Sequence, residues 1–168
     1  MAAGGKRTTV YLGLGANLSD RAEMIRRAIA LLARRGLDVQ ARSPLYETEP
    51  VTPDPQPAYL NAALRAETAL APAALLAVCL EVERALGRRR PADRPQAPRE
   101  IDVDILLYGG QVIDDPPSLV VPHPRLLDRA FVRIPLRDVA TPGLRHPVTG
   151  DPLDRAAPDP AVRRRGAS

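Results

Sequence analysis

Apolar residues in this chain recur at two spacings, and the order in which these spacings alternate limits the possible folds. Short runs of apolar and β-branched residues predict strands at residues 8–14, 39–48, 59–70 and 101–108. Apolar residues three and four positions apart predict helices over residues 24–32 and 75–86. The predicted order is therefore strand, helix, strand, strand, helix, strand.

The ends of both predicted helices carry start and stop residues. Asp20, followed three residues later by Glu23, forms a capping-box pattern before the first helix, and Gly36 supplies a stop after it. Pro72 stands where the first turn of a helix tolerates proline, and Gly87 closes the second helix. These local signals support two separate helices.

The order of elements is that of a split βαβ unit. We therefore predict an α+β fold, a ferredoxin-like βαββαβ sandwich in which an antiparallel sheet has helices packed on one face. The length of 168 residues suits one domain. We expect residues 1–168 to form a single domain, with a folded core at residues 8–141 and flexible tails at residues 1–7 and about 150–168.

Less regular segments join and follow these elements. Gly109 and Gly110 predict a tight turn, with Val112 and Ile113 in a returning strand. Residues 126–139 are expected to be helical in part, with an interruption at Pro135. Many of the 19 prolines fall at residues 50–57 and 142–160, which predicts a loop and a tail with little regular structure beyond about residue 142.

Composition excludes some classes of protein and leaves others open. A net charge of +4 and a pI near 9.8 favour anionic ligands but do not distinguish nucleotide, nucleic acid and membrane. The lone Cys79 excludes an internal disulfide, and its apolar helical setting predicts a buried, inert thiol. The start does not resemble a signal peptide, and no apolar run reaches the roughly 20 residues that span a bilayer. We therefore expect a cytoplasmic protein that does not engage membranes.

The strongest local signal for chemistry is a pair of acids inside an apolar strand, Asp102 and Asp104. Side chains alternate along a strand, so both acids face one way, about 6.6 Å apart along the chain, while Ile101, Val103 and Ile105 face the core. Two acids on one such face repel each other unless a cation lies between them. Mg²⁺ that also binds substrate phosphates suits such ligands. A merely exposed strand face is the simpler alternative for a bare D-x-D pattern, although aspartate is disfavoured in strands.

The segment before this strand is rich in arginine, at Arg84, Arg88, Arg89, Arg90, Arg94 and Arg99. A planar guanidinium matches phosphate oxygens, so a basic loop that leads into an acidic pair is typical of a triphosphate–magnesium site. A solvated basic loop and a nucleic-acid patch are the alternatives. Aromatic residues make up only 3% of the chain, which leaves few rings for stacking on bases.

Other common catalytic patterns lack support. The sequence contains no G-x-x-x-x-G-K-[ST] phosphate-binding motif, and the glycines between Gly13 and Asn17 lack the dinucleotide-binding spacing. His123 and His146 are the only two histidines, which with a single cysteine argues against a zinc site.

Five segments, spread in order over roughly residues 10–140, resemble one enzyme family; they are YLGLGANLSDR, SPLYETEP, QPAYLNAALRAET, PREIDVDILLYG and VPHPRLLDRAFV. The family is that of the 6-hydroxymethyl-7,8-dihydropterin pyrophosphokinases of folate biosynthesis. The resemblance implies a ferredoxin-like fold. It also implies transfer of pyrophosphate from ATP to the hydroxymethyl group of the pterin, giving the pterin diphosphate and AMP.

The same resemblance implies roles for individual residues. Asp102 and Asp104 match ligands of two Mg²⁺ ions, and Arg88 and Arg99 match catalytic arginines. The implied pterin-binding residues are Thr48, Val51, Tyr59, Asn61 and Phe131. The implied ATP-binding residues are Glu83, Arg88, Arg90, Arg99, Ile105, His123 and Arg129. In isolation Tyr59 and Phe131 would be interpreted as core residues, Glu83 as a solvated helix residue and His123 as a loop residue.

We expect the partners to be ATP and the reduced pterin, with no nucleic acid, and we expect a monomer. Residues 50–57 and 88–98 are predicted to be mobile lids that close on the ligands. Two alternatives stay open: a ferredoxin-like RNA-binding module that uses its arginines, and a relative that binds pterin without catalysis. Intact Arg99, Asp102 and Asp104 argue against the second.

Overall fold

The computed structural model describes residues 5–17, 20–49, 58–87 and 101–165. Within these residues, none of the helices has the length and apolar character needed to cross a membrane. The elements in chain order are β1 (Thr8–Ala16), α1 (Arg21–Arg34), β2 (Leu37–Arg42), β3 (Tyr46–Thr48), β4 (Tyr59–Thr68), α2 (Pro72–Ala85), β5 (Asp102–Tyr108), β6 (Ile113–Asp115), β7 (Leu119–Val121), α3 (Ala130–Val139) and β8 (Val162–Arg164).

A six-stranded antiparallel sheet forms the middle of the molecule. Its strand order is β5-β1-β4-β3-β8, and β2 also pairs with β4. β1 and β4 pair along their full lengths, from Thr8 opposite Thr68 to Ala16 opposite Leu60. The predicted α+β fold, with an antiparallel sheet in the order βαββαβ, is confirmed.

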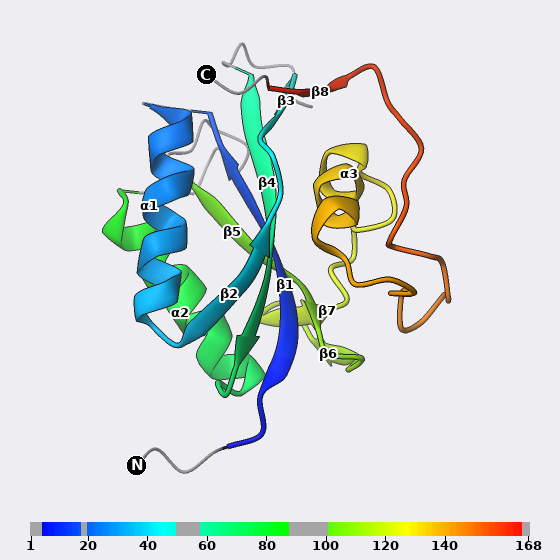
Figure 1. Cartoon of the computed structure of the whole chain (residues 1–168). Coiled ribbons are helices and arrows are strands. Elements are labelled where there is room, and N and C mark those ends of the chain that lie inside the picture. The colour runs from blue at the N-terminus through cyan, green and yellow to red at the C-terminus, as the bar shows by residue number, and fades with distance from the viewer. Residues whose placement is uncertain (1–4, 18–19, 50–57, 88–100, 166–168) are drawn as a thin grey trace.

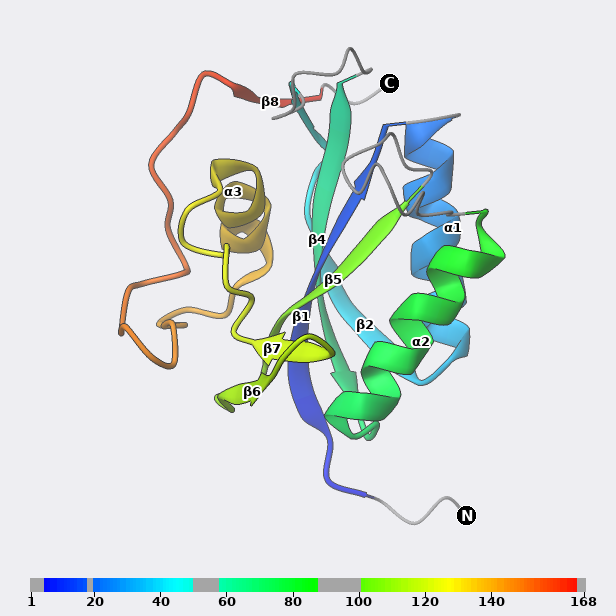
Figure 2. The same ribbon diagram turned by 180° about the vertical axis from the view of Figure 1, so that it is seen from behind.

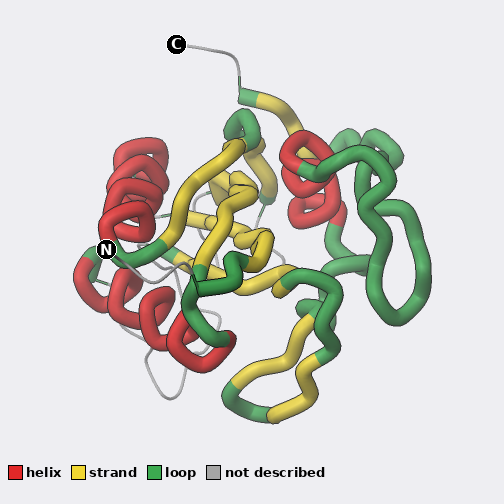
Figure 3. Tube along the Cα trace, turned by 60° about the horizontal axis from the view of Figure 1, so that its bottom comes forward, coloured by secondary structure: helices red, strands yellow, loops and turns green. Residues whose placement is uncertain are grey.

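Helices cover both faces of this sheet (Figures 1 and 2). α1 and α2 pack on one face, as predicted, and α3 packs on the other, which the predicted pattern did not include. Alternate residues of a strand therefore enter different cores: Leu12 packs on the side of α1 and α2, whereas Tyr11 packs on the side of α3. Figure 3 shows the strands between the two sets of helices.

The predicted helix ends are confirmed. The side chain of Asp20 accepts a hydrogen bond of 3.2 Å from the N–H of Glu23, which satisfies one of the free donors in the first turn of α1. Gly36 follows α1 with a φ of 107°, a backbone conformation that side chains strongly disfavour. Pro72 opens α2.

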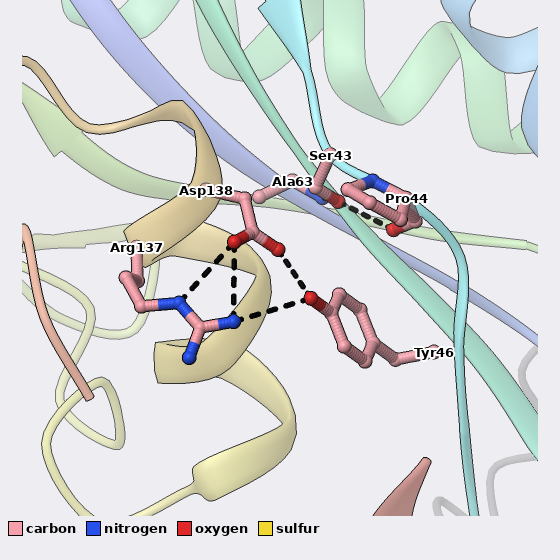
Figure 4. Close-up of polar contacts among 6 residues, drawn as sticks. All are labelled: Ser43, Pro44, Tyr46, Ala63, Arg137 and Asp138. Atoms are coloured by element: carbon pink, nitrogen blue, oxygen red, sulfur yellow. Dashed lines mark hydrogen bonds and ion pairs between the residues drawn. The ribbon is translucent and has the colours of Figure 1, made fainter. Parts of the chain in front are cut away.

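The single strand predicted at residues 39–48 is wrong, because the chain breaks between β2 and β3 at Ser43 and Pro44. Proline has no N–H to give to a strand ladder. The Ser43 hydroxyl bridges the break: it accepts from the N–H of Ala63 at 2.9 Å and donates to the carbonyl of Pro44 at 2.7 Å (Figure 4). The chain thus stays beside β4 while the ladder is interrupted.

Two further predictions differ from the structure. The strand after Gly110 does not return along β5; β6 pairs with β7 instead, with Ile113 opposite Val121. Pro135 does not interrupt α3 but lies inside it and is buried. The neighbouring Ile134 and Leu136 are also buried, so tertiary packing holds the helix together despite the missing backbone donor.

The chain is also more ordered after residue 142 than predicted. It passes on the outside of α3 and ends as β8, which pairs with β3 at the edge of the sheet (Figures 1 and 2). Leu153 is only 1% exposed and packs in the core on the α3 side. The packed part of the chain therefore extends beyond the boundary expected at residue 141.

Candidate active site

A cavity of about 180 Å³ lies beside the sheet, between its central strands and the start of α3. Its lining comes from β1, β3, β4, β5, the segment after β7, and α3. The lining residues are Gly13, Leu14, Gly15, Thr48, Glu49, Tyr59, Asn61, Ala62, Asp102, Asp104, Leu106, His123, Arg129, Phe131 and Val132.

The two aspartates of β5 reach this cavity together. Ile101, Val103 and Ile105 point the opposite way and pack in the core on the side of α1 and α2. The predicted alternation, with both acids on one side of the strand, is thus confirmed. Directly across the ladder, Gly13 is the partner of Asp104 and Gly15 is the partner of Asp102. Neither position on β1 carries a side chain, and both glycines line the cavity beside the acids.

The carboxylates of Asp102 and Asp104 are ligands that suit a magnesium ion. Among the described residues, no group of three or more His, Cys, Asp or Glu side chains is placed to hold a metal. On β5, Asp102 and Asp104 offer two carboxylates to the cavity. Mg²⁺ commonly takes one or two protein carboxylates and completes its shell with water and substrate phosphates.

Glu83 lies behind the acidic strand and not in the cavity. It is 5% exposed on α2, and its carboxyl oxygen accepts a 2.9 Å hydrogen bond from the N–H of Val103, the residue between the two acids. Ile105, 6% exposed, is also in the core on that side. These two residues were expected at the nucleotide but do not line the cavity. Glu83 belongs to α2, and Ile105, like Val103, lies on the face of β5 that packs against α2.

One wall of the cavity is made by β3 and β4. Tyr59 and Asn61 come from β4, and Thr48 comes from β3. The amide of Asn61 donates to the hydroxyl oxygen of Thr48 at 2.8 Å, and both side chains are buried. Because this contact uses the amide nitrogen, the orientation of the Asn61 side chain is fixed.

The opposite wall is made by the start of α3. Phe131 and Val132 lie in the first turn, and Arg129 is the residue that caps it. The guanidinium carbon of Arg129 lies 5.5 Å from the centre of the Phe131 ring, within cation–π range. An aromatic ring on each wall, Tyr59 and Phe131, suits a flat aromatic ligand.

His123 lines the cavity between the acids and α3. The backbone N–H of His123 donates to the carbonyl of Leu106 at 3.0 Å. The ring Nδ1 of His123 accepts from the backbone N–H of Arg125 at 3.1 Å. Burial lowers the pKa of His123; Asp104 opposes this effect, whereas Arg129 and Arg125 add to it. A neutral imidazole at neutral pH follows from this balance.

Several expected residues lie outside the described residues. These are Arg88, Arg90, Arg99 and Val51, together with both predicted lids at residues 50–57 and 88–98. Of the remaining expected residues, the cavity brings together Thr48, Tyr59, Asn61, Asp102, Asp104, His123, Arg129 and Phe131.

The sequence did not reveal the remaining lining residues. Gly13 and Gly15 were noted only for lacking a dinucleotide-binding spacing, and their role appears once β1 is paired with β5. Glu49 and Val132 carried no separate signal. The signal that could have found the glycines is their alternation on a strand next to the acidic strand.

Comparison with known proteins places most of the chain in one family. Residues 11–141 match the family model described as 7,8-dihydro-6-hydroxymethylpterin-pyrophosphokinase (HPPK). The 2-amino-4-hydroxy-6-hydroxymethyldihydropteridine pyrophosphokinase of Methylorubrum extorquens is 46% identical over 134 residues, which are 79% of this chain and 83% of that protein. The folic acid synthesis protein fol1 of Pneumocystis carinii is 43% identical over 141 residues, which are 84% of this chain but only 18% of that longer protein.

Solved structures agree on the fold. A Plasmodium falciparum HPPK-DHPS structure matches 91% of this chain and 44% of its own, with a TM-score of 0.69 and 15% sequence identity. At this low identity the likeness concerns the fold alone.

Proposed function

The chain belongs to the 7,8-dihydro-6-hydroxymethylpterin-pyrophosphokinase family, and from this we propose that it makes the pterin diphosphate of folate biosynthesis. The co-substrates are ATP and 6-hydroxymethyl-7,8-dihydropterin. The pterin hydroxymethyl oxygen attacks the β-phosphorus of ATP, and a new P–O bond forms there. The bond between the β-phosphorus and the oxygen that bridges it to the α-phosphorus breaks. AMP leaves with that oxygen, and the hydroxyl proton passes to solvent. The acting unit is a monomer.

The observation that carries this proposal is that one cavity joins two unlike sets of side chains. Asp102 and Asp104 supply negative charge on β5, whereas Tyr59 and Phe131 supply apolar rings on opposite walls. A cation–phosphate group suits the first set and a flat heterocycle suits the second. An enzyme that joins a pterin to a phosphate chain needs both within one site.

We assign two Mg²⁺ ions to Asp102 and Asp104. Bound magnesium would neutralise phosphate charge and orient the triphosphate. The protein's own residues position the substrates. Asn61, held by Thr48, presents its amide to the edge of the pterin, and Arg129 brings positive charge to the cavity.

Further residues are assigned by their match to the family signature. Arg88 and Arg99 balance charge that develops on the β-phosphate, and Arg90 adds to ATP binding. Val51 contributes to the pterin pocket through its backbone. Glu83 and Ile105 support the nucleotide side from behind β5, since neither lines the cavity.

The test is to incubate the protein with ATP, Mg²⁺ and the reduced pterin, and to measure AMP and pterin diphosphate together. Asp102→Asn and Asp104→Asn keep the side-chain shape but remove the charge, so each should lower kcat at least about 100-fold. Asp115→Asn, an exposed change on β6, is the control and should match the wild type. Wild-type turnover in either cavity variant would refute the metal assignment, and absence of AMP from the wild-type reaction would refute the function.

A further inference from the structure

A polar cluster outside the cavity joins two of its walls. Tyr46 of β3 is 5% exposed, and its hydroxyl donates to Oδ2 of Asp138 on α3 (Figure 4). Arg137 donates from Nη2 to the Tyr46 hydroxyl oxygen at 3.3 Å and to Oδ1 of Asp138 at 3.1 Å. None of these three residues lines the cavity.

On the sheet side, Tyr46 is coupled to the residues of the β3–β4 wall. It lies directly opposite Asn61 in the β3–β4 ladder. Thr48 follows two residues later on the same face of β3 and accepts the hydrogen bond from Asn61. A displacement of β3 at Tyr46 therefore moves Thr48 and Asn61 as well.

On the helix side, Asp138 is coupled to the opposite wall. It stands seven residues after Phe131, which is two helical turns, so the two side chains share one side of α3. Arg65 of β4 also holds this end of the helix, by a 2.9 Å hydrogen bond from Nε to the carbonyl of Val139. At 1.5 Å per residue, Phe131 lies about 10 Å further along the helix, so a small tilt at the anchored end displaces its ring.

We propose that Tyr46 is a positioning residue for the pterin: by holding Asp138, it sets the spacing between the Thr48–Asn61 wall and the Phe131 wall. This inference rests on the proposed function, because it assumes that the reduced pterin binds between these walls. The hydroxyl is what matters, since phenylalanine would fill the same space without donating a hydrogen bond to Asp138.

The setting of the hydroxyl supports this role. A buried hydroxyl needs a hydrogen-bond partner, and Asp138 supplies it. Burial raises the pKa of Tyr46, and the contact with Asp138 raises it further, so the proton stays on the phenol and is donated to the carboxylate.

The cluster should affect the binding of one substrate more than that of the other. It joins β3 to α3, whereas the acids stand on β5, at the far side of β1 and β4 in the strand order. Loss of the Tyr46 hydroxyl should therefore raise the KM for pterin more than the KM for ATP and leave kcat within about twofold. Partial loss of one charge-assisted hydrogen bond predicts a rise of about five- to tenfold in the Kd for pterin.

The experiment measures pterin binding directly, by titration calorimetry on the wild type, Tyr46→Phe, Asp138→Ala and the double variant. Tyr108→Phe is the matched control, because Tyr108 is 6% exposed and its hydroxyl donates to the carbonyl of Leu70 at 2.6 Å, away from the cavity. We expect weaker pterin binding in both single variants, no additional loss in the double variant, and wild-type affinity in the control.

Each other outcome overturns a specific claim. If the wild type binds no pterin, the proposed function fails. If the wild type binds but Tyr46→Phe binds equally well, or if Tyr108→Phe is weakened to the same extent, the positioning role fails. Additive losses in the double variant would show that Tyr46 does not act through Asp138. Thermal unfolding of each variant establishes that it is folded. If Tyr46→Phe does not fold, the pterin affinity of Asp138→Ala is compared with that of the wild type instead.

Discussion

The buried carboxyl of Glu83 offers a sharp test of what holds the acidic strand in place. In Glu83→Ala, the N–H of Val103 loses its 2.9 Å acceptor in a buried position. An unsatisfied buried donor costs about 1–3 kcal/mol, and the lost γ-methylene costs about 0.8 kcal/mol more. We therefore expect the free energy of unfolding to fall by about 3 kcal/mol, which lowers the Tm by about 6–12 °C.

Urea unfolding followed by circular dichroism measures this change. Glu83→Gln keeps an acceptor and the methylenes, so it should lose less than about 1 kcal/mol. Glu81→Ala is the control on the same helix, because Glu81 makes an exposed ion pair with Arg35 and its replacement should cost under about 1 kcal/mol. Equal stability of Glu83→Ala and Glu81→Ala would refute the reasoning. A raised KM for ATP in Glu83→Gln would point instead to direct contact with the nucleotide.

Three further predictions concern other sites. Gly15→Ala should raise the KM for pterin several-fold, because an added Cβ would lie 3.3 Å from Oδ1 of Asn61, whereas Gly110→Ala, with open space, should not; equal KM values would contradict this. Burial raises the pKa of Cys79 to about 12, so a thiol reagent at pH 8 should label it only after unfolding, and rapid labelling of the native protein would show the burial to be wrong. The pKa of Tyr46 is raised above 10, so its stabilising contribution is complete below pH 10 and lost as pH rises through the folded-state pKa. The stability difference between wild type and Tyr46→Phe should therefore shrink above pH 10, and a constant difference would contradict the assignment.

The parts of the fold that the sequence predicted are those governed by neighbouring residues. The cap at Asp20 depends on a residue three positions away, and the shared direction of Asp102 and Asp104 depends on strand alternation alone. The order of strands and helices follows from the same short-range patterns. Short-range sequence patterns were therefore enough to predict that Asp102 and Asp104 lie on the same side of β5.

The parts that the sequence did not predict depend on distant residues. Pro135 remains helical because its neighbours are buried against the sheet, a condition that no local pattern contains. β8 is ordered because β3 offers a free edge more than 100 residues earlier in the chain. The contact between Tyr46 and Asp138 spans 92 positions and has no counterpart in periodicity or motif.

The pairing of β8 with β3 also has a consequence for how the molecule is made. Thr48 lies opposite Val162 in this ladder, so one wall of the cavity gains its outer neighbour only after residue 162 has been synthesised. While the polypeptide is still emerging from the ribosome, β3 is a three-residue edge strand, and its backbone groups on the side that will face β8 are unpaired. In a nascent chain stalled before residue 162, β5 with its two aspartates should therefore be able to pair with β1, whereas β3 in the proposed pterin wall should still lack its partner β8.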